Sequence, residues 1–221
     1  MFKNRTAQLV FLSAFCTIAL LGTIASFGTF NYEWRGDFFV HFTNLSNYFC
    51  SVIGVIELVQ TIRKKEDSYI TSCRSVKFVG MLMILLTFLV FNGMLAPVRE
   101  SYLNFRINSV LFHIVLPIMY VADWFLFYER KQISWKLPLI SISAPLIYVI
   151  FIYIRAWILH FDSSVPYIYP YFFLDLDKQG LPGVLKWIVI LLIGFVALGY
   201  IMYGFDRITR KKALENKEND Q

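Results

Sequence analysis

Six long apolar segments constrain this chain more than any other feature of its sequence. A helix that crosses the hydrocarbon core of a bilayer needs about 20 mainly apolar residues. Six stretches of the 221-residue chain meet that requirement, and they lie at residues 7–30, 38–62, 76–96, 107–128, 137–159 and 183–205. The sequence therefore predicts an all-α integral membrane protein: a six-transmembrane-helix bundle over residues 1–206, followed by a basic, then polar tail over residues 207–221.

The composition agrees with a membrane bundle and argues against a soluble domain. Hydrophobic residues make up 57% of the chain and charged residues 16%, whereas charged residues form about 25% of an ordinary soluble domain. The apolar segments are continuous and do not alternate, so an outer-membrane β-barrel is not predicted. A helix satisfies its own backbone hydrogen bonds in lipid, which favours helices for all six segments.

The basic residues predict the orientation of the bundle. Most of the 21 Lys and Arg residues lie before the first segment, in the turns after the second and fourth, and beyond the sixth. All four places are on the same side of a six-helix bundle, so the positive-inside rule predicts that both termini are cytoplasmic. The net charge of +6 is then explained by topology and anionic lipid, and nucleic-acid binding is not predicted.

The three cysteines give no sign of a metal centre. Cys16, Cys50 and Cys73 form no CxxC motif and no cluster with histidine. A structural zinc or iron–sulfur site is therefore not predicted, and no other cofactor is implied.

Polar side chains follow one face of the second and the fourth segment. They recur at spacings of three and four residues, which places them on the same side of a helix. In lipid such groups face the bundle interior, so the two faces predict a polar seam, which serves either as structural glue or as a site. The seam consists of Thr43, Ser46, Asn47, Cys50, Gly54 and Glu57 on one segment and Arg106, Ser109, His113, Pro117, Tyr120 and Asp123 on the other.

Depth singles out one pair of residues in this seam. At a rise of 1.5 Å per residue, Thr43 lies roughly 8 Å and His113 roughly 9 Å below the outer ends of their segments. A threonine hydroxyl and an imidazole can therefore meet just below the outer headgroups, at the depth of a lipid ester. A hydroxyl becomes a nucleophile when an adjacent base takes its proton, and histidine suits that role near neutral pH.

The chemistry of ester cleavage predicts further groups around this pair. A tetrahedral oxyanion needs hydrogen-bond donors, and a substrate carboxylate needs a cation. The candidate oxyanion donors are Asn44, Asn47 and Asn92, and the candidate cations on the outer half are Arg99, Arg106 and Arg155.

Three segments in order carry a family resemblance: residues 42–47 (FTNLSN), residues 113–117 (HIVLP) followed by Asp123 and Trp124, and residues 169–175 (YPYFFLD). The chain resembles the superfamily of androgen-induced and androgen-dependent TFPI-regulating proteins and their bacterial six-span relatives. This resemblance covers the spacing of all six helices. It implies a transmembrane threonine hydrolase that cleaves fatty acid esters of hydroxy fatty acids, with Thr43 as nucleophile and His113 as base.

The short, Lys-rich termini and the Phe-rich helices look bacterial, which would place the protein in the bacterial cytoplasmic membrane. The depth of Thr43 and His113 predicts that the site is near the outer face of that membrane. Phe172 stands where the bacterial motif usually has a second proline, which bears on the shape of the pocket. The expected function is hydrolysis of a membrane lipid or lipid-like acyl ester.

The alternative is a non-catalytic membrane protein that binds or transports a lipid or small amphiphile through the same seam. An intramembrane protease is less favoured, because no Gly-x-Ser-x-Gly occurs and Asp123 has no obvious intramembrane carboxylate partner except Glu57. The aromatic and acidic outer segment 160–182 is interpreted as an interfacial belt or as a lid over the site.

Overall fold

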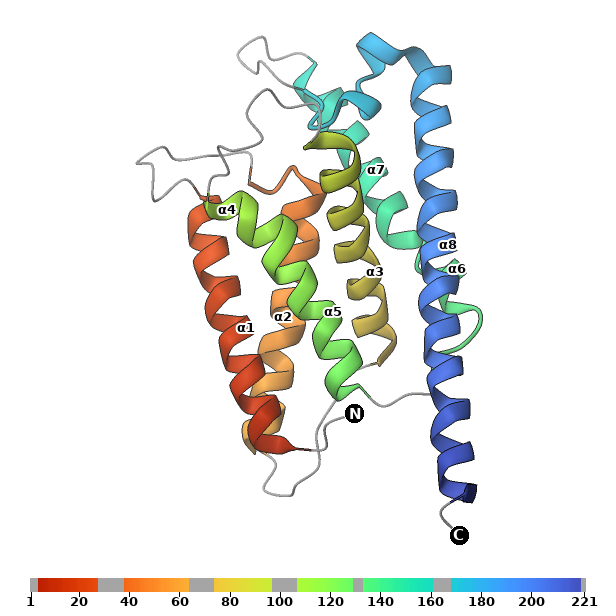
Figure 1. Cartoon of the computed structure of the whole chain (residues 1–221). Helices are drawn as coiled ribbons and strands as arrows, with labels where there is room; N and C mark the ends of the chain where they lie inside the picture. The colour runs from red at the N-terminus through yellow and green to blue at the C-terminus, as the bar shows by residue number, and fades with distance from the viewer. Residues whose placement is uncertain are drawn as a thin grey trace. The chain divides into compact units, whose positions relative to one another are not determined.

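The structure is a computed structural model that describes residues 4–27, 38–63, 74–96, 107–128, 133–160 and 168–219, without the side chains of Asn108 and of residues 208–219. The described elements are all helical (Figure 1). In chain order they are α1 (Arg5–Ser26), α2 (Phe42–Arg63), α3 (Arg74–Val90), the π-helix η2 (Phe91–Leu95), α4 (Ile107–Val110), the π-helix η3 (Leu111–Val115), α5 (Leu116–Phe127), α6 (Leu137–Ile140), α7 (Ser143–Leu159), the 3-10 helix η4 (Phe172–Leu174) and α8 (Leu176–Asn219).

The predicted helical class is confirmed over these residues, which contain no strand. Among the residues that the structure describes, five helices are long and apolar enough to cross a membrane, and a shorter apolar helix runs over Leu111–Phe127. The five span candidates are Arg5–Ser26, Phe42–Arg63, Arg74–Leu95, Leu137–Leu159 and Leu176–Arg207. The shorter helix falls within the fourth predicted segment, where a π-turn interrupts the regular α-helix.

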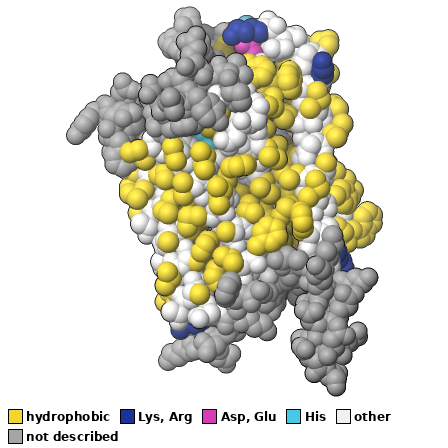
Figure 2. Space-filling view, viewed as in Figure 1, with side chains coloured by type: hydrophobic (Ala, Val, Ile, Leu, Met, Phe, Trp, Pro, Cys, Tyr) yellow, Lys and Arg dark blue, Asp and Glu magenta, His cyan; other side chains and the backbone are white. Residues whose placement is uncertain are grey.

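Large apolar side chains cover the outside of these helices. Trp157 is 71% exposed, and Val10, Ile118 and Ile193 are also exposed. Figure 2 shows hydrophobic side chains over most of the described surface in its view. Contiguous apolar surface of this extent is unfavourable in water and favourable in lipid. The chain therefore has the surface of an integral membrane protein.

The residues separate into two compact units, residues 1–133 with 209–221 and residues 134–208. In the first unit, α2 packs against α1 and α3, and α5 packs against the same two helices (Figure 1). The polar faces of α2 and α5 are thereby directed to the centre of the unit. This arrangement produces the polar seam that the sequence predicted.

Two glycines allow close contacts between helices of the first unit. A Cβ atom added at Gly22 would lie 2.5 Å from the Phe112 ring, and one at Gly54 would lie 2.6 Å from the Phe15 ring. Small residues commonly permit such approaches between membrane helices. The contact at Gly22 holds α1 directly against η3, the segment that carries His113.

In the second unit, α8 changes direction at Gly180. The backbone there has a φ of 63°, which glycine adopts without the steric cost of a Cβ. Pro182 follows two residues later, so it lies in the first turn of the long straight part of α8, where its missing N–H is not needed. The helix continues to Asn219, through the region that the sequence interpreted as a polar tail.

Candidate functional site

Thr43 lies in the first turn of α2. The Asn44 side chain donates to the Phe38 carbonyl at 2.9 Å, and the backbone N–H groups of Asn44 and Leu45 donate to the His41 carbonyl. These bonds fix the residue at which α2 begins and therefore the position of Thr43 in its first turn. The Thr43 side chain is buried there, at 8% exposure.

The position of Thr43 in the helix distinguishes it from other threonines in the chain. Thr17, Thr23 and Thr61 each donate to the carbonyl four residues earlier, at 2.7–2.9 Å, as membrane threonines commonly do. The residue four positions before Thr43 is Phe39, which precedes the start of α2. The usual helical acceptor is therefore missing for the Thr43 hydroxyl.

His113 lies at the centre of the π-helix η3. Because of Pro117, two carbonyls of this turn lack their helical N–H donors. The Leu116 N–H reaches back to the Leu111 carbonyl, as in a π-turn. Pro117 has no N–H, so the α-helical donor for the His113 carbonyl and the π-helical donor for the Phe112 carbonyl are both missing. Buried carbonyls without donors are costly, so other groups must supply them.

Two asparagine side chains supply these donors. Asn47 Nδ2, from α2, lies 3.0 Å from the Phe112 oxygen, and Asn92 Nδ2, from η2, lies 3.3 Å from the His113 oxygen. Asn47 Nδ2 also donates to the Thr43 carbonyl at 2.8 Å. One amide group therefore ties the backbone of Thr43 to the residue beside His113.

The His113 ring is held on two sides. It stacks on the Phe91 ring, with centroids 3.5 Å apart and planes inclined by 19°. Its Nδ1 lies 2.9 Å from the Ser109 carbonyl oxygen. A carbonyl only accepts hydrogen bonds, so Nδ1 carries the hydrogen and Nε2 is the basic nitrogen of the neutral ring.

The Ser109 carbonyl is thus the group that orients His113, and sequence reasoning missed it. The Asn47 side chain, which faces this segment from α2, binds backbone carbonyls and not the imidazole. The Ser109 hydroxyl is 3.3 Å from Nδ1, but Nδ1 already donates to a carbonyl and is not placed to accept its proton. The identity of a side chain does not show that its backbone carbonyl accepts a hydrogen bond. The four-residue spacing of Ser109 and His113 was the one signal that the two could meet on the same face of a helix.

The structure thus brings the segments of Thr43 and His113 together through Asn47, and α2 contacts η3 directly. Direct pairing of the Thr43 hydroxyl with the imidazole stays a prediction. The oxyanion role of the three asparagines also stays a prediction. Both hydrogens of the Asn47 and Asn92 amides are directed to carbonyls, namely those of Thr43 and Phe112 for Asn47 and of Phe88 and His113 for Asn92.

Of the three candidate cations, Arg99 and Arg106 lie outside the described residues. Arg155 belongs to the second unit, where its Nη1 donates to the Ile168 carbonyl at 2.5 Å. The role of all three as partners of a substrate carboxylate stays a prediction.

The segment 168–175 of the second unit is a packed structure. The Tyr153 hydroxyl donates to the Leu174 carbonyl at 3.0 Å, and Phe172 and Phe173 both contact the Trp187 ring. Partial burial, together with Asp177 and Asp175, raises the pKa of Tyr169, so its phenol is neutral near pH 7. These contacts fasten the segment to α7 and α8.

A second polar cluster lies further along α2, about 21 Å from Thr43 at the helical rise per residue. Lys77 of α3 contacts Glu57 of α2 at 2.6 Å and also Asp123 of α5, and all three are at most 3% exposed. The polar seam predicted from the sequence contains Glu57 and Asp123, and Lys77 was not predicted to join them. All three side chains are buried, and the Lys77 ammonium group pairs with each of the two carboxyl groups.

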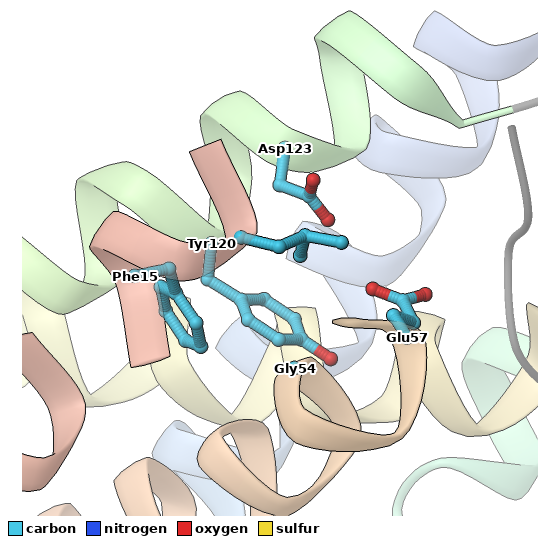
Figure 3. Close-up of a pocket in the computed structure, with 6 residues that line it drawn as sticks. Phe15, Gly54, Glu57, Tyr120 and Asp123 are labelled. Carbon is cyan, nitrogen blue, oxygen red and sulfur yellow. The ribbon is translucent and has the colours of Figure 1, made fainter. Parts of the chain in front are cut away.

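A narrow pocket, too tight for a water molecule, borders this charge cluster (Lys77, Glu57 and Asp123). Its walls are Leu12, Phe15, Gly54, Glu57, Tyr120 and Asp123. In Figure 3, Tyr120 extends from α5 toward the part of α2 that carries Gly54 and Glu57. No group of three or more His, Cys, Asp or Glu side chains able to hold a metal ion occurs in the described part of the chain.

Comparisons with protein-family models, curated proteins and solved structures gave no match to this chain.

Proposed function

We propose that the protein is an intramembrane hydrolase of lipid acyl esters, with Thr43 as nucleophile and His113 as general base. Fatty acid esters of hydroxy fatty acids are the substrate class that the family resemblance implies. The observation that carries this proposal is the hydrogen bond from His113 Nδ1 to the Ser109 carbonyl. It leaves Nε2 as the basic nitrogen of an oriented ring, which is what activation of a hydroxyl requires.

In the proposed reaction, His113 Nε2 takes the proton of the Thr43 hydroxyl while Thr43 Oγ1 attacks the ester carbonyl. The tetrahedral intermediate collapses, the C–O bond to the alcohol breaks, and His113 returns the proton to the leaving oxygen. Water, activated by the same nitrogen, then hydrolyses the acyl-threonine and releases the fatty acid. The chain needs no metal or organic cofactor for these steps.

Labelling with a fluorophosphonate probe tests the nucleophile. The purified full-length protein in detergent should carry the adduct on Thr43, and Thr43→Ala and His113→Ala should abolish it. Thr17→Ala is the matched control, because Thr17 is a membrane threonine bonded to its own helix. Full ester hydrolysis by a folded Thr43→Ala protein would rule out this mechanism.

One observation favours the alternative, a non-catalytic protein that binds or transports a lipid or small amphiphile. Asn47 and Asn92 already donate both amide hydrogens to backbone carbonyls, so an oxyanion would have to displace one of these bonds. This alternative predicts saturable binding of a fluorescent fatty acid that survives Thr43→Ala, with no product formed from an ester analogue.

The proposal includes a topology of six spans with both termini in the cytoplasm of a bacterium and the Thr43–His113 site near the outer face. The short helix Leu111–Phe127, extended by α4, supplies the sixth span. The Arg5 side chain donates to the Thr61 and Ile62 carbonyls, so the start of α1 and the end of α2 share one side. That side also carries Arg63 and Arg74, as the positive-inside rule requires of a cytoplasmic face.

A further inference from the structure

Two buried hydroxyl groups connect α3 to the backbone of Thr43. Ser46 Oγ, on α2, lies 2.9 Å from the Thr43 carbonyl oxygen and 2.9 Å from Thr87 Oγ1, on α3. Ser46 is 0% and Thr87 is 4% exposed. The polar seam predicted from the sequence contains Ser46, whereas Thr87 was not part of it. Together the two side chains form a hydroxyl bridge (Thr87 and Ser46) between the helices.

The direction of the hydrogen bonds in the hydroxyl bridge follows from the final acceptor. A carbonyl oxygen only accepts, so the Ser46 hydroxyl gives its single hydrogen to the Thr43 carbonyl. The Ser46 oxygen is then the acceptor for the Thr87 hydroxyl. Thr61, by contrast, donates to a carbonyl of its own helix. The Thr87 hydroxyl is therefore directed from α3 to α2.

The Thr43 carbonyl is held by side chains that connect it to two neighbouring segments. The hydroxyl bridge connects it to α3, and Asn47 Nδ2, which donates to it at 2.8 Å, also donates to the Phe112 carbonyl of η3. The Thr43 hydroxyl itself has no carbonyl four residues earlier in its helix that could fix it. The position of Thr43 Oγ1 therefore depends on how the backbone of Thr43 is held.

The segment that carries Thr87 also holds His113. Phe91, four residues beyond Thr87, stacks on the His113 ring, and Asn92 donates to the His113 carbonyl. Thus α3 and η2 contact the proposed base directly and reach the proposed nucleophile through the hydroxyl bridge. A single continuous segment can therefore fix the position of one reacting side chain relative to the other.

We propose that Thr87 is a positioning residue for the proposed hydrolysis, and this inference rests on that function. By donating to Ser46, Thr87 holds Thr43 Oγ1 where His113 can take its proton. Thr87 acts on geometry alone and gives no group to the reaction. A displacement of a reacting group by about 1 Å can cost about 100-fold in rate, so the loss of this one hydrogen bond should cost about tenfold.

The kinetics of fluorophosphonate labelling of Thr43 in the purified full-length protein test this role. The labelled fraction at saturation counts the folded sites, whereas the second-order rate constant reports the geometry of each site. Thr87→Val keeps the shape of the side chain without its hydroxyl, so the rate constant should fall about tenfold at a similar labelled fraction. Thr87→Ser keeps the hydroxyl and should restore the rate constant. Thr61→Val is the control at a buried position whose hydroxyl bonds its own helix, and it should label at the wild-type rate.

Ser46→Ala removes the other half of the hydroxyl bridge and should also slow labelling. Adding Thr87→Val to it should slow labelling no further, because both residues act through the same hydrogen bonds. A wild-type rate constant for Thr87→Val, slow labelling of Thr87→Ser, additive losses in the double variant or a loss confined to the labelled fraction would overturn the positioning role and leave the proposed function intact. No adduct on Thr43 in the wild type would refute the proposed function and this inference with it.

Discussion

Pro117 determines how the His113 ring is held. Without a proline N–H, the carbonyls of Phe112 and His113 turn to Asn47 and Asn92, and the wide turn places Nδ1 against the Ser109 carbonyl. We therefore expect neutral His113 to be protonated on Nδ1. Nitrogen-15 NMR of labelled histidine should show this tautomer, with His113→Gln to assign the signal. Pro117→Ala restores the missing donor and should lower its population, whereas an Nε2-protonated ring in the wild type would contradict the geometry.

Among the residues of this site, Asn47 is the one whose substitution should lower the free energy of unfolding most. It is 1% exposed and donates to the Phe112 carbonyl, for which Pro117 has no N–H to offer. Asn47→Asp replaces that donor with an acceptor, so the unfolding free energy should fall by about 1–3 kcal/mol or more. Thermal or SDS denaturation in detergent measures it. Asn44→Asp is the control with a smaller effect, because Asn44 is only partly buried.

Among the elements, α1 and η3 depend on the absence of a side chain at Gly22. Gly22→Val should push the Phe112 ring aside, separate α1 from η3 and destabilise the protein by about 1–3 kcal/mol, the usual cost of overpacking. Gly194→Ala is the control, since an added Cβ there meets nothing within 4 Å and should be neutral or slightly stabilising. Equal thermal stability of the Gly22→Val protein and the wild type would show that the contact is loose.

Lys77 connects three elements, α2, α3 and α5. Lys77→Met leaves two buried carboxyl groups without their cation and should cost about 3–5 kcal/mol. Adding Glu57→Gln and Asp123→Asn should recover most of that loss, because no buried charge then remains. Denaturation of the single and triple variants measures both effects, and a triple variant no more stable than Lys77→Met would show that the cluster is not held by charge.

The comparison of elements with the sequence shows what pattern alone can predict. The second segment, predicted at 38–62, corresponds to α2, and its polar spacing identified the buried face correctly from Thr43 to Glu57. Apolar length and a regular period are sufficient for that. The π-turns were missed because one extra residue in a turn changes no composition, and Pro117 was the signal for the π-turn at Leu111–Val115. The burial of Lys77 could not be predicted, because it depends on partners 20 and 46 residues away in the chain.

For the whole molecule, the orientation in the membrane is the main prediction. In a background with the native cysteines replaced, Lys178→Cys should react with a membrane-impermeant maleimide on intact bacterial cells. Asn4→Cys should react only after the cells are broken, because the positive-inside rule places it in the cytoplasm. The reverse pattern would invert the bundle and move the Thr43–His113 site to the inner face.

The π-turn at Leu111–Val115 also has a consequence for helical phase. One additional residue in an α-helix rotates everything on one side of it by about 100° relative to the other. The portion with Ser109 and the portion with Asp123 therefore follow two different angular registers. Deleting a single residue from the turn would merge these registers. Asp123 could then keep its contact with Lys77 only if His113 rotated away from Phe91. The extra residue of the π-turn therefore allows one helix to direct both side chains to their partners.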